Sequence, residues 1–292
     1  MLRPLMEDRM EAQGRPRGMT MSFRGLGRVF GSGLGSVLVL AGLVGCPRPA
    51  VRPYPPPSAA ELAAYLRERV SRVGSMRSEA KVDYFEGRGQ RVRVTMDFPI
   101  APPGRLRVDA ESPIGGAVIG SLASDGDRFQ YLDVERNRYV LGPARPCNLG
   151  RLLRVNLGPA DMVAVIAGVA PLLGEPVSVR WKSREGGREV LLLRGPRGEE
   201  ETIELEARER RWNVRRAELR EPGGQLRYRL EHEDFGPGEP ALPGKTHIVE
   251  PARKVDVLIR YREHERGVTP PEGAFHLDPP MGLEPEVVDC EP

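Results

Sequence analysis

The sequence has few of the residues on which enzymatic and metal sites depend. Its 292 residues include four His and three Cys, and none of them forms an HExxH or CxxC motif. A GxSxG nucleophile motif and a phosphate-binding loop are also missing. Because no nucleophile stands at a recognisable spacing from a base, a hydrolase is the least favoured class of function. We expect no catalytic residue, no metal and no cofactor.

Two of the His residues, His232 and His264, each stand between two Glu residues. This pattern is compatible with a weak metal patch, but charged strand edges are the interpretation that we favour. We interpret the acidic run at residues 199–201 in the same way, as a solvated turn.

The chain also lacks a large charge imbalance outside its N-terminal region. Residues 1–45 hold six Arg and three acidic residues, so 38 basic and 38 acidic residues remain in the rest of the chain. A neutral body gives no reason to expect a nucleic-acid partner.

An apolar segment at residues 29–43 follows Arg24 and Arg28. It is too short and too rich in Gly to span a membrane. A basic stretch followed by an apolar run of this length predicts a signal peptide over residues 1–45, with Met19 or Met21 as the true start.

The apolar segment ends in Leu-Val-Gly-Cys at residues 43–46, which resembles the bacterial lipobox. The resemblance implies cleavage after Gly45 and attachment of a diacylglycerol to Cys46. Pro47, in place of Asp, favours the outer membrane, so we expect a lipid-anchored protein that faces the periplasm. Several acyl chains would hold such an anchor in the membrane permanently.

Residues 46–57 are rich in Pro and predict an extended spacer between the lipid and the folded body. Ser58 and Glu61 then form a capping box that starts a helix. Apolar residues follow at helical spacing, and polar residues 67–69 lie between them.

After Gly74 the hydrophobic period changes to two, which is typical of half-buried strands. Strands are predicted at residues 78–85, 91–98, 106–110, 117–124, 128–133, 138–141, 177–184, 189–194, 202–207, 212–219, 226–233, 245–249 and 255–263. Turn residues separate most of them, so a single antiparallel meander is favoured. Two short helices are predicted midway, at residues 148–155 and 159–168.

These patterns predict a mainly β fold of the α+β class. A wide sheet with one apolar and one charged face must curl around the apolar face or cover it. We therefore expect a curled, unclosed antiparallel barrel of about 11–13 strands over residues 58–266. The N-terminal helix and the helical insertion would act as its lid, and residues 267–292 form a Pro-rich tail along the surface.

A concave apolar interior is the usual form of a site for an acyl chain, although side chains could also fill it completely. The predicted cavity residues are Val92, Val94, Met96, Phe98, Trp212, Val214, Leu226, Tyr228, Leu230, Val257 and Ile259. The predicted lid residues are Leu62, Leu66, Leu152 and Met162. Cys147 and Cys290 could form a disulfide in an oxidising compartment, or they could remain separate thiols.

Several segments resemble the outer-membrane lipoprotein carrier and receptor family (LolA/LolB-like). They are AKVD at residues 80–83, PPGRLR at 102–107, LASDGDRF at 122–129 and NRYVLG at 137–142. The resemblance extends over residues 58–278. It implies an unclosed barrel whose helices cover a cavity for the acyl chains of lipoproteins or phospholipids.

The resemblance also implies partners. An anchored receptor of this family takes lipoproteins from a soluble periplasmic carrier protein and delivers them to the outer membrane. Ile114 would then be the apolar tip of a projecting loop, and the protein would act as a monomer. The alternative that remains is an assembly lipoprotein whose barrel is a solid platform for a protein partner.

Overall fold

The computed structural model describes residues 50–86, 90–153, 155–184, 186–208 and 211–290. The predicted signal peptide, its start residues Met19 and Met21, and the predicted acylation site Cys46 lie outside the described residues. The helices are α1 (Ala59–Val73), α2 (Pro146–Leu153), α3 (Pro159–Ile166) and the 3-10 helix η1 (Pro251–Arg253). The strands are β1 (Met76–Glu86), β2 (Gln90–Ala101), β3 (Arg105–Glu111), β4 (Val118–Ser124), β5 (Arg128–Asp133), β6 (Arg138–Pro143), β7 (Glu175–Lys182), β8 (Arg188–Arg194), β9 (Glu200–Arg208), β10 (Arg211–Arg220), β11 (Leu226–Glu233), β12 (Lys245–Glu250), β13 (Val255–Arg266) and β14 (Glu286–Val287).

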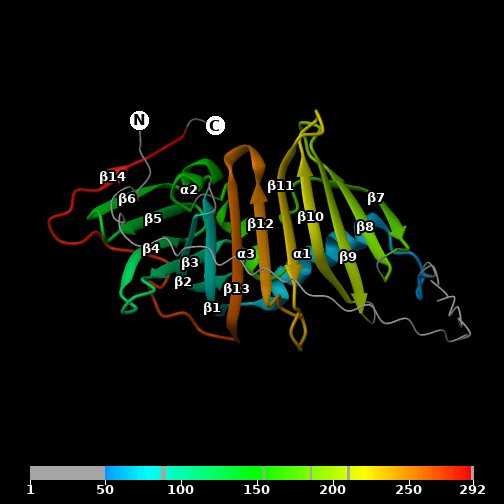
Figure 1. The fold of residues 1–292 in the computed structure, drawn as a ribbon, viewed down its shortest axis with the longest axis horizontal. Coiled ribbons are helices and arrows are strands. Elements are labelled where there is room, and N and C mark those ends of the chain that lie inside the picture. Colours follow the sequence, from blue (N-terminus) through cyan, green and yellow to red (C-terminus); the bar gives the residue numbers. More distant parts are fainter. Residues whose placement is uncertain (1–49, 87–89, 154, 185, 209–210, 291–292) are drawn as a thin grey trace, which may run out of the picture. The chain divides into compact units, whose positions relative to one another are not determined.

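These strands form one curled, unclosed sheet, which confirms the predicted fold class (Figure 1). The strand order is β14-β6-β5-β4-β3-β2-β1-β13-β12-β11-β10-β9-β8-β7. The predicted strands correspond to β1 through β13, and all their pairings are antiparallel. The tail adds β14, which pairs with β6 in parallel.

The expectation of a single meander is wrong. The chain makes one meander from β1 to β6 and a second from β7 to β13, and β1 pairs with β13 where the two meet. The helices α2 and α3 lie between β6 and β7 in the sequence, so they carry the chain from one side of the sheet to the other (Figure 1). The crossover therefore places the helices where they can cover the concave face.

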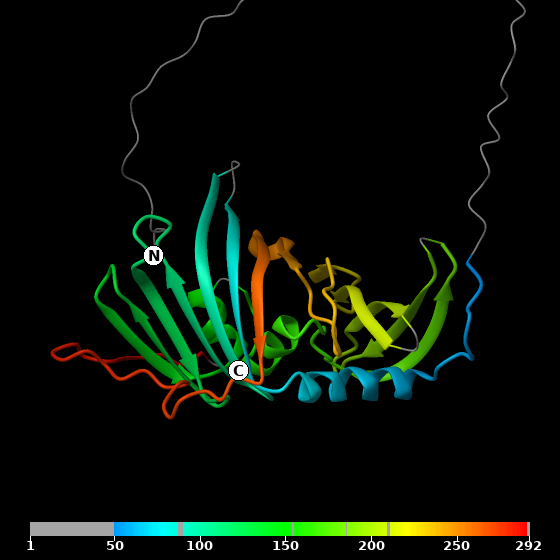
Figure 2. The same ribbon diagram turned by 90° about the horizontal axis from the view of Figure 1, so that it is seen from below.

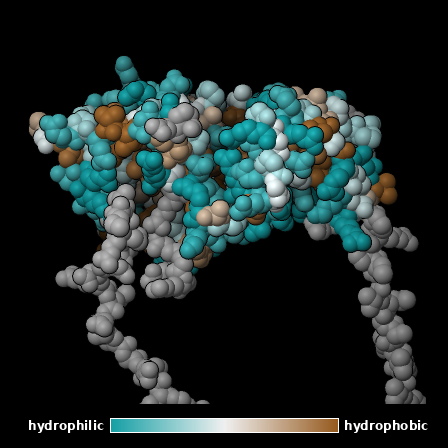
Figure 3. All heavy atoms as spheres, turned by 90° about the horizontal axis from the view of Figure 1, so that it is seen from above, coloured by the Kyte–Doolittle hydropathy of each residue, from teal (hydrophilic) through white to brown (hydrophobic). Residues whose placement is uncertain are grey.

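Alternating side chains give the sheet an apolar concave face and a charged outer face. On the outer face, the Asp83 carboxylate is shielded from solvent and accepts hydrogen bonds from Arg93 Nε at 2.7 Å and Arg91 Nη2 at 2.6 Å, while Arg260 contacts it from β13. The side of the body seen in Figure 3 is mostly hydrophilic, and its hydrophobic residues form small separate groups. Most apolar side chains are thus directed inward.

The helix α1 lies along the sheet beside β7 and β8 (Figure 2). It begins with the predicted capping box, in which Ser58 Oγ accepts from Glu61 N at 3.1 Å and Glu61 Oε2 accepts from Ser58 N at 2.6 Å. Arg69 departs from the predicted polar stripe because it is buried and donates to Asn213 Oδ1 on β10 at 3.0 Å. This bond fixes α1 on the sheet.

The Pro-rich segment before α1 is not a free spacer over residues 50–54, which corrects the sequence prediction. Ala50 N donates to Ser183 O at 2.8 Å, and Trp181 Nε1 donates to Ala50 O at 2.8 Å. Arg52 donates to Glu189 Oε2 at 2.8 Å, and the Glu189 side chain has no solvent exposure. The segment is therefore part of the folded body.

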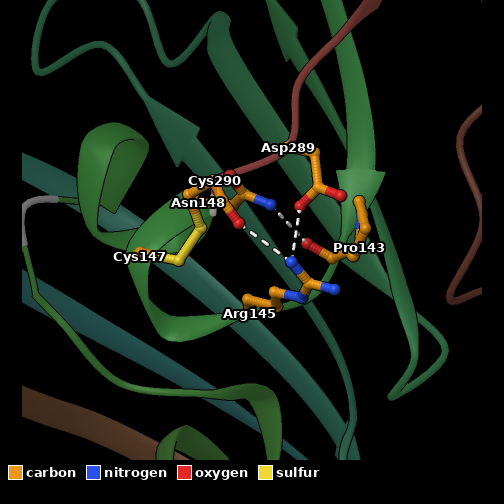
Figure 4. The surroundings of a disulfide bond; sticks show 6 residues. All are labelled: Pro143, Arg145, Cys147, Asn148, Asp289 and Cys290. Atoms are coloured by element: carbon orange, nitrogen blue, oxygen red, sulfur yellow. Dashed lines mark hydrogen bonds and ion pairs between the residues drawn. A yellow bond between two sulfur atoms is a disulfide. The ribbon is translucent and has the colours of Figure 1, made fainter. Parts of the chain in front are cut away.

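The C-terminal tail covers the edge strand β6. Val288 N donates to Leu141 O at 2.9 Å beyond the short β14 pairing. A disulfide then joins Cys290 to Cys147 on α2, with a Cα–Cα distance of 6.3 Å (Figure 4). Beside it, Arg145 Nη1 contacts Asp289 Oδ1 at 2.9 Å and donates to Cys290 O at 2.8 Å. The tail protects this sheet edge from pairing with another chain.

No helix among the described residues has the length and apolar character needed to cross a lipid bilayer.

Candidate functional site

An apolar cavity of about 70 Å³ lies between the concave face of the sheet and the helical insertion. Its walls come from β1, β2, β3, β12 and β13, and its cover comes from α2, α3 and the segment between these helices. The lining residues are Val82, Tyr84, Met96, Phe98, Leu106, Val108, Leu153, Val155, Leu157, Met162, Val165, Ile166, Ile248, Val257 and Ile259. Tyr84 supplies the single hydroxyl group in this set.

Some of the residues predicted to line the cavity do so, and others lie elsewhere. The four predicted residues that line it are Met96, Phe98, Val257 and Ile259. Tyr228 and Leu230 line a separate void of about 10 Å³. The other five are Val94 and Val214, which are buried in the core, and Val92, Trp212 and Leu226, which are half-buried. Four of the eleven predicted residues therefore line the cavity beneath the helical insertion.

The rest of the concave face is covered by α1 and by the docked segment before it. The Trp212 ring meets the Tyr65 ring of α1 edge-on, with centroids 5.1 Å apart. Tyr54 meets the same ring edge-on at 6.3 Å. Because aromatic side chains fill this space, Trp212 belongs to a packed contact and not to the cavity.

The predicted lid residues also separate into two groups. Met162 of α3 lines the cavity, whereas Leu152 of α2 packs against the core beside the lining residue Leu153. Leu62 and Leu66 of α1 are fully buried against the sheet and do not line the cavity. The cover thus consists of α2, α3 and the segment that joins them.

Sequence reasoning missed most of the lining from the helical insertion and from three strands. The missed residues are Val82, Tyr84, Leu106, Val108, Leu153, Val155, Leu157, Val165, Ile166 and Ile248. The strand residues among them, such as Val82 and Val108, lie on the same alternating apolar face as the predicted ones. That alternation could have identified them, but it does not indicate which part of the face remains uncovered.

Glu201 is buried beside Tyr228, a residue that lines the smaller void, which corrects the expectation of a solvated turn at residues 199–201. It accepts a hydrogen bond from Leu173 N at 3.0 Å and another from the Tyr228 hydroxyl. Burial raises the pKa of Glu201 to about 7. The alternation could have revealed it, because Glu201 has the same parity as the buried Ile203 and Leu205.

This pKa predicts that the protein loses stability as the pH rises. Between the ordinary pKa of 4.5 and the folded pKa of about 7, the native state holds a proton at Glu201 that the unfolded chain releases. The free energy of unfolding should therefore fall with increasing pH, by at most about 1.4 kcal/mol per pH unit from this group.

Urea unfolding at several pH values tests the prediction. The Glu201→Gln variant should show a smaller fall, because its side chain does not ionise. The exposed neighbour Glu200 provides the control, and Glu200→Gln should retain the wild-type slope. An unchanged slope in Glu201→Gln would contradict the assigned titration.

His232 corrects the expectation of a charged strand edge. It is fully buried on β11 and lies 2.9 Å from Thr246 Oγ1 through Nδ1 and 3.4 Å from Val169 O through Nε2. Burial lowers its pKa to about 3, so the ring is neutral at physiological pH. Within the described residues, no group of three or more His, Cys, Asp or Glu side chains is arranged to hold a metal ion.

Neither a family model nor a curated protein sequence matches the chain. Solved structures do. A LolA superfamily protein from Nitrosomonas europaea superposes with a TM-score of 0.52 at 12% identity, covering 74% of this chain and 97% of that one. A DUF1329 family protein from Desulfovibrio piger gives 0.54 at 13% identity, covering 74% and 96%. An outer membrane lipoprotein-sorting protein domain from Vibrio parahaemolyticus gives 0.53 at 9% identity, covering 73% and 94%.

The chain has a LolA/LolB-like fold. At these sequence identities the solved structures support the predicted fold but do not identify a ligand. The disulfide between Cys147 and Cys290, one of the two alternatives left open by the sequence, connects the C-terminal tail to α2.

Ile114, the residue predicted for a loop tip of the LolA/LolB-like fold, lies between β3 and β4. Its side chain is 86% exposed, and its backbone N donates to Ser112 Oγ at 3.3 Å. An exposed Ile at the end of a hairpin can enter an apolar phase without rearrangement of the core. Its role in this protein belongs to the proposal that follows.

Proposed function

We propose that this protein is a lipid-anchored envelope protein that binds the acyl chains of lipoproteins or phospholipids in the cavity beneath α2 and α3. The observation that carries the proposal is an apolar cavity under a short helical cover in a LolA/LolB-like fold. Each methylene group moved from water into such a site contributes about 0.8 kcal/mol. No covalent chemistry is required.

The size of the cavity defines what binding must involve. A buried water molecule needs about 10–15 Å³ of such space, so about 70 Å³ corresponds to a few water molecules or a short alkyl segment. A longer acyl chain therefore requires displacement of the cover. The cover is suited to this because α3 is only eight residues long and is joined to its neighbours by Gly158 and Gly168.

Substitution of Met96 by Asp tests the proposed site. Met96 lines the cavity from β2, and a carboxylate there would face hydrocarbon. We expect binding of a fluorescent fatty acid such as cis-parinaric acid to weaken by at least about tenfold, because an uncompensated charge in an apolar site is strongly unfavourable. Fluorescence titration of the mature chain carrying Cys46→Ser, which removes the competing anchor, measures this change.

The neighbouring residue Thr95 provides a matched control because it alternates with Met96 and does not line the cavity. Thr95→Asp should bind the probe as the parent does. If Met96→Asp unfolds, Val108→Phe should weaken binding by filling the cavity without introducing charge. Unchanged affinity in a folded Met96→Asp or Val108→Phe variant would show that the interior is not the acyl site.

Anchoring completes the proposal. Acylated Cys46 would hold the protein to the outer membrane, on the periplasmic side. The exposed Ile114 would touch the bilayer that receives the acyl chains, and a soluble periplasmic carrier protein would supply them. Depletion of the protein should then cause other lipoproteins to accumulate before the outer membrane, and their normal distribution would argue against this transfer role.

The small size of the resting cavity favours one alternative, an assembly lipoprotein whose barrel serves as a solid platform for a protein partner. The two functions differ in bound lipid. Mass spectrometry of the purified chain carrying Cys46→Ser should find co-purified acyl lipid if the cavity binds it. Complete absence of lipid, together with no uptake of the fatty acid probe, would favour the platform.

A further inference from the structure

A second hollow, of about 140 Å³, adjoins the apolar cavity at the turn between β12 and β13. Its lining is Tyr84, Phe85, Gly150, Arg253, Lys254, Val255, Asp256 and Val257. Tyr84 and Val257 line both spaces, and they are cross-strand partners in the pairing of β1 with β13. A single residue pair therefore stands between a polar hollow and an apolar cavity.

The charges in the polar hollow favour an anion. Lys254 follows η1, is exposed, and has no ion-pair partner among the residues that the structure describes. Asp256 also lines the hollow, but its Oδ1 lies 2.7 Å from His247 Nε2, and it forms no ion pair with Lys254. The hollow thus presents an unsatisfied cation at the edge of the apolar cavity.

Arg253 places a second cation in the same hollow. Its Nη2 donates to Gly150 O of α2 at 2.9 Å, and its Nη1 lies 3.5 Å from Glu250 Oε2. A Cβ atom at position 150 would lie 2.8 Å from Arg253 Nη1, so the Gly in the middle of α2 allows this close approach. Gly in the interior of a helix lowers the stability of the helix relative to Ala. The guanidinium group of Arg253 occupies the space that a side chain at position 150 would take.

We propose that the polar hollow is a head-group subsite for an acyl lipid with an anionic head group. Its carboxylate or phosphate would lie against Lys254 and Arg253, and its alkyl chain would pass Tyr84 and Val257 into the apolar cavity. The inference rests on the acyl-binding function proposed above and specifies the chemistry of its ligand. Charge complementarity selects the anionic head group, and the volume of about 70 Å³ limits the tail in the closed state to part of one chain.

Ligands with one tail and different head groups test this subsite. Dodecanoate, dodecyl phosphate, dodecanol and dodecylamine are titrated, below their critical micelle concentrations, into the mature chain carrying Cys46→Ser with bound cis-parinaric acid as reporter. The two anions should bind on the order of tenfold more tightly than dodecanol, as expected for charge-assisted hydrogen bonds to a head group. Dodecylamine should bind more weakly than dodecanol.

Lys254→Asn removes the unpaired cation and keeps the backbone, because Asn tolerates the left-handed conformation at this position, where φ is 56°. This variant should bind dodecanol as before and lose most of its preference for the anions. Arg184→Gln, a change at an exposed Arg outside the hollow, is the matched control and should keep the full preference. Loss of the preference in the control would overturn the assignment to Lys254.

The outcomes separate this inference from the proposed function. Equal affinity for dodecanoate and dodecanol would overturn the head-group subsite and leave acyl binding intact. Failure of the reporter and of all four ligands to bind would remove both. Inorganic phosphate alone tests the opposite assignment, a site for a free anion. That assignment would hold if phosphate raised the melting temperature of the parent but not of Lys254→Asn, and if dodecyl phosphate bound no more tightly than inorganic phosphate. The amphiphile assignment would then be wrong.

Discussion

Replacement of both Cys147 and Cys290 by Ser is expected to lower the free energy of unfolding by about 2–4 kcal/mol. The disulfide closes a loop with a sequence separation of 143 residues, so its removal greatly enlarges the unfolded ensemble. It is also the covalent link between the tail and α2. The interactions that remain at this end of the tail, such as Arg145 with Asp289, are exposed and individually weak.

Denaturant unfolding of the parent and the double Ser variant measures this change, and the parent under reducing conditions should behave like the variant. Hydrogen exchange supplies the local control. The amides of β6 and α2 should exchange faster without the disulfide, whereas those of β8 and β9 should not. A double variant as stable as the parent would mean that the disulfide makes no net contribution to folding.

Replacement of Arg52 by Ala is expected to cost about 3–5 kcal/mol, since it leaves the buried Glu189 carboxylate without its partner. The effect is unusual for a residue in a Pro-rich linker, and it follows from the docking of this segment on β7 and β8. Arg180, an exposed Arg on the same part of the sheet, gives the comparison, and Arg180→Ala should change the stability by well under about 1 kcal/mol.

A double-mutant cycle separates the pair from its surroundings. Replacing both Arg52 and Glu189 by Leu should recover most of the lost stability, because an apolar pair of similar volume leaves no buried charge behind. Limited proteolysis should cut the linker of Arg52→Ala faster than that of the parent. Cleavage at the parental rate, or a stability change below about 1 kcal/mol, would argue that the docking seen here contributes little in solution.

This docking changes the geometry expected for the proposed lipid anchor. The sequence predicted a spacer over residues 46–57, but residues from Ala50 onward contact the body. Only residues 47–49 then separate the docked segment from the predicted anchor at Cys46. A composition rich in Pro predicts an extended conformation, and an extended segment can still pair with a neighbouring surface.

Local sequence determined the elements of this protein. The alternation of apolar and charged residues predicted β1 to β13, and the capping box at Ser58 and Glu61 predicted the start of α1. Both signals depend on neighbours within a few residues, so they can be read without knowledge of the rest of the chain. The same alternation would also have placed Glu201 and His232 on the inner face, had it been applied to polar residues.

Only the tertiary structure determined how these elements pair and pack against one another. The pairing of β1 with β13, the closure of Cys147 with Cys290, and the docking of Arg52 on Glu189 each join residues far apart in the sequence, and no local pattern encodes them. The cavity follows from the same long-range contacts. A strand pattern shows which side chains face inward, whereas the packing of α1 and the linker over one half of the sheet, and of α2 and α3 over the other, determines where space remains.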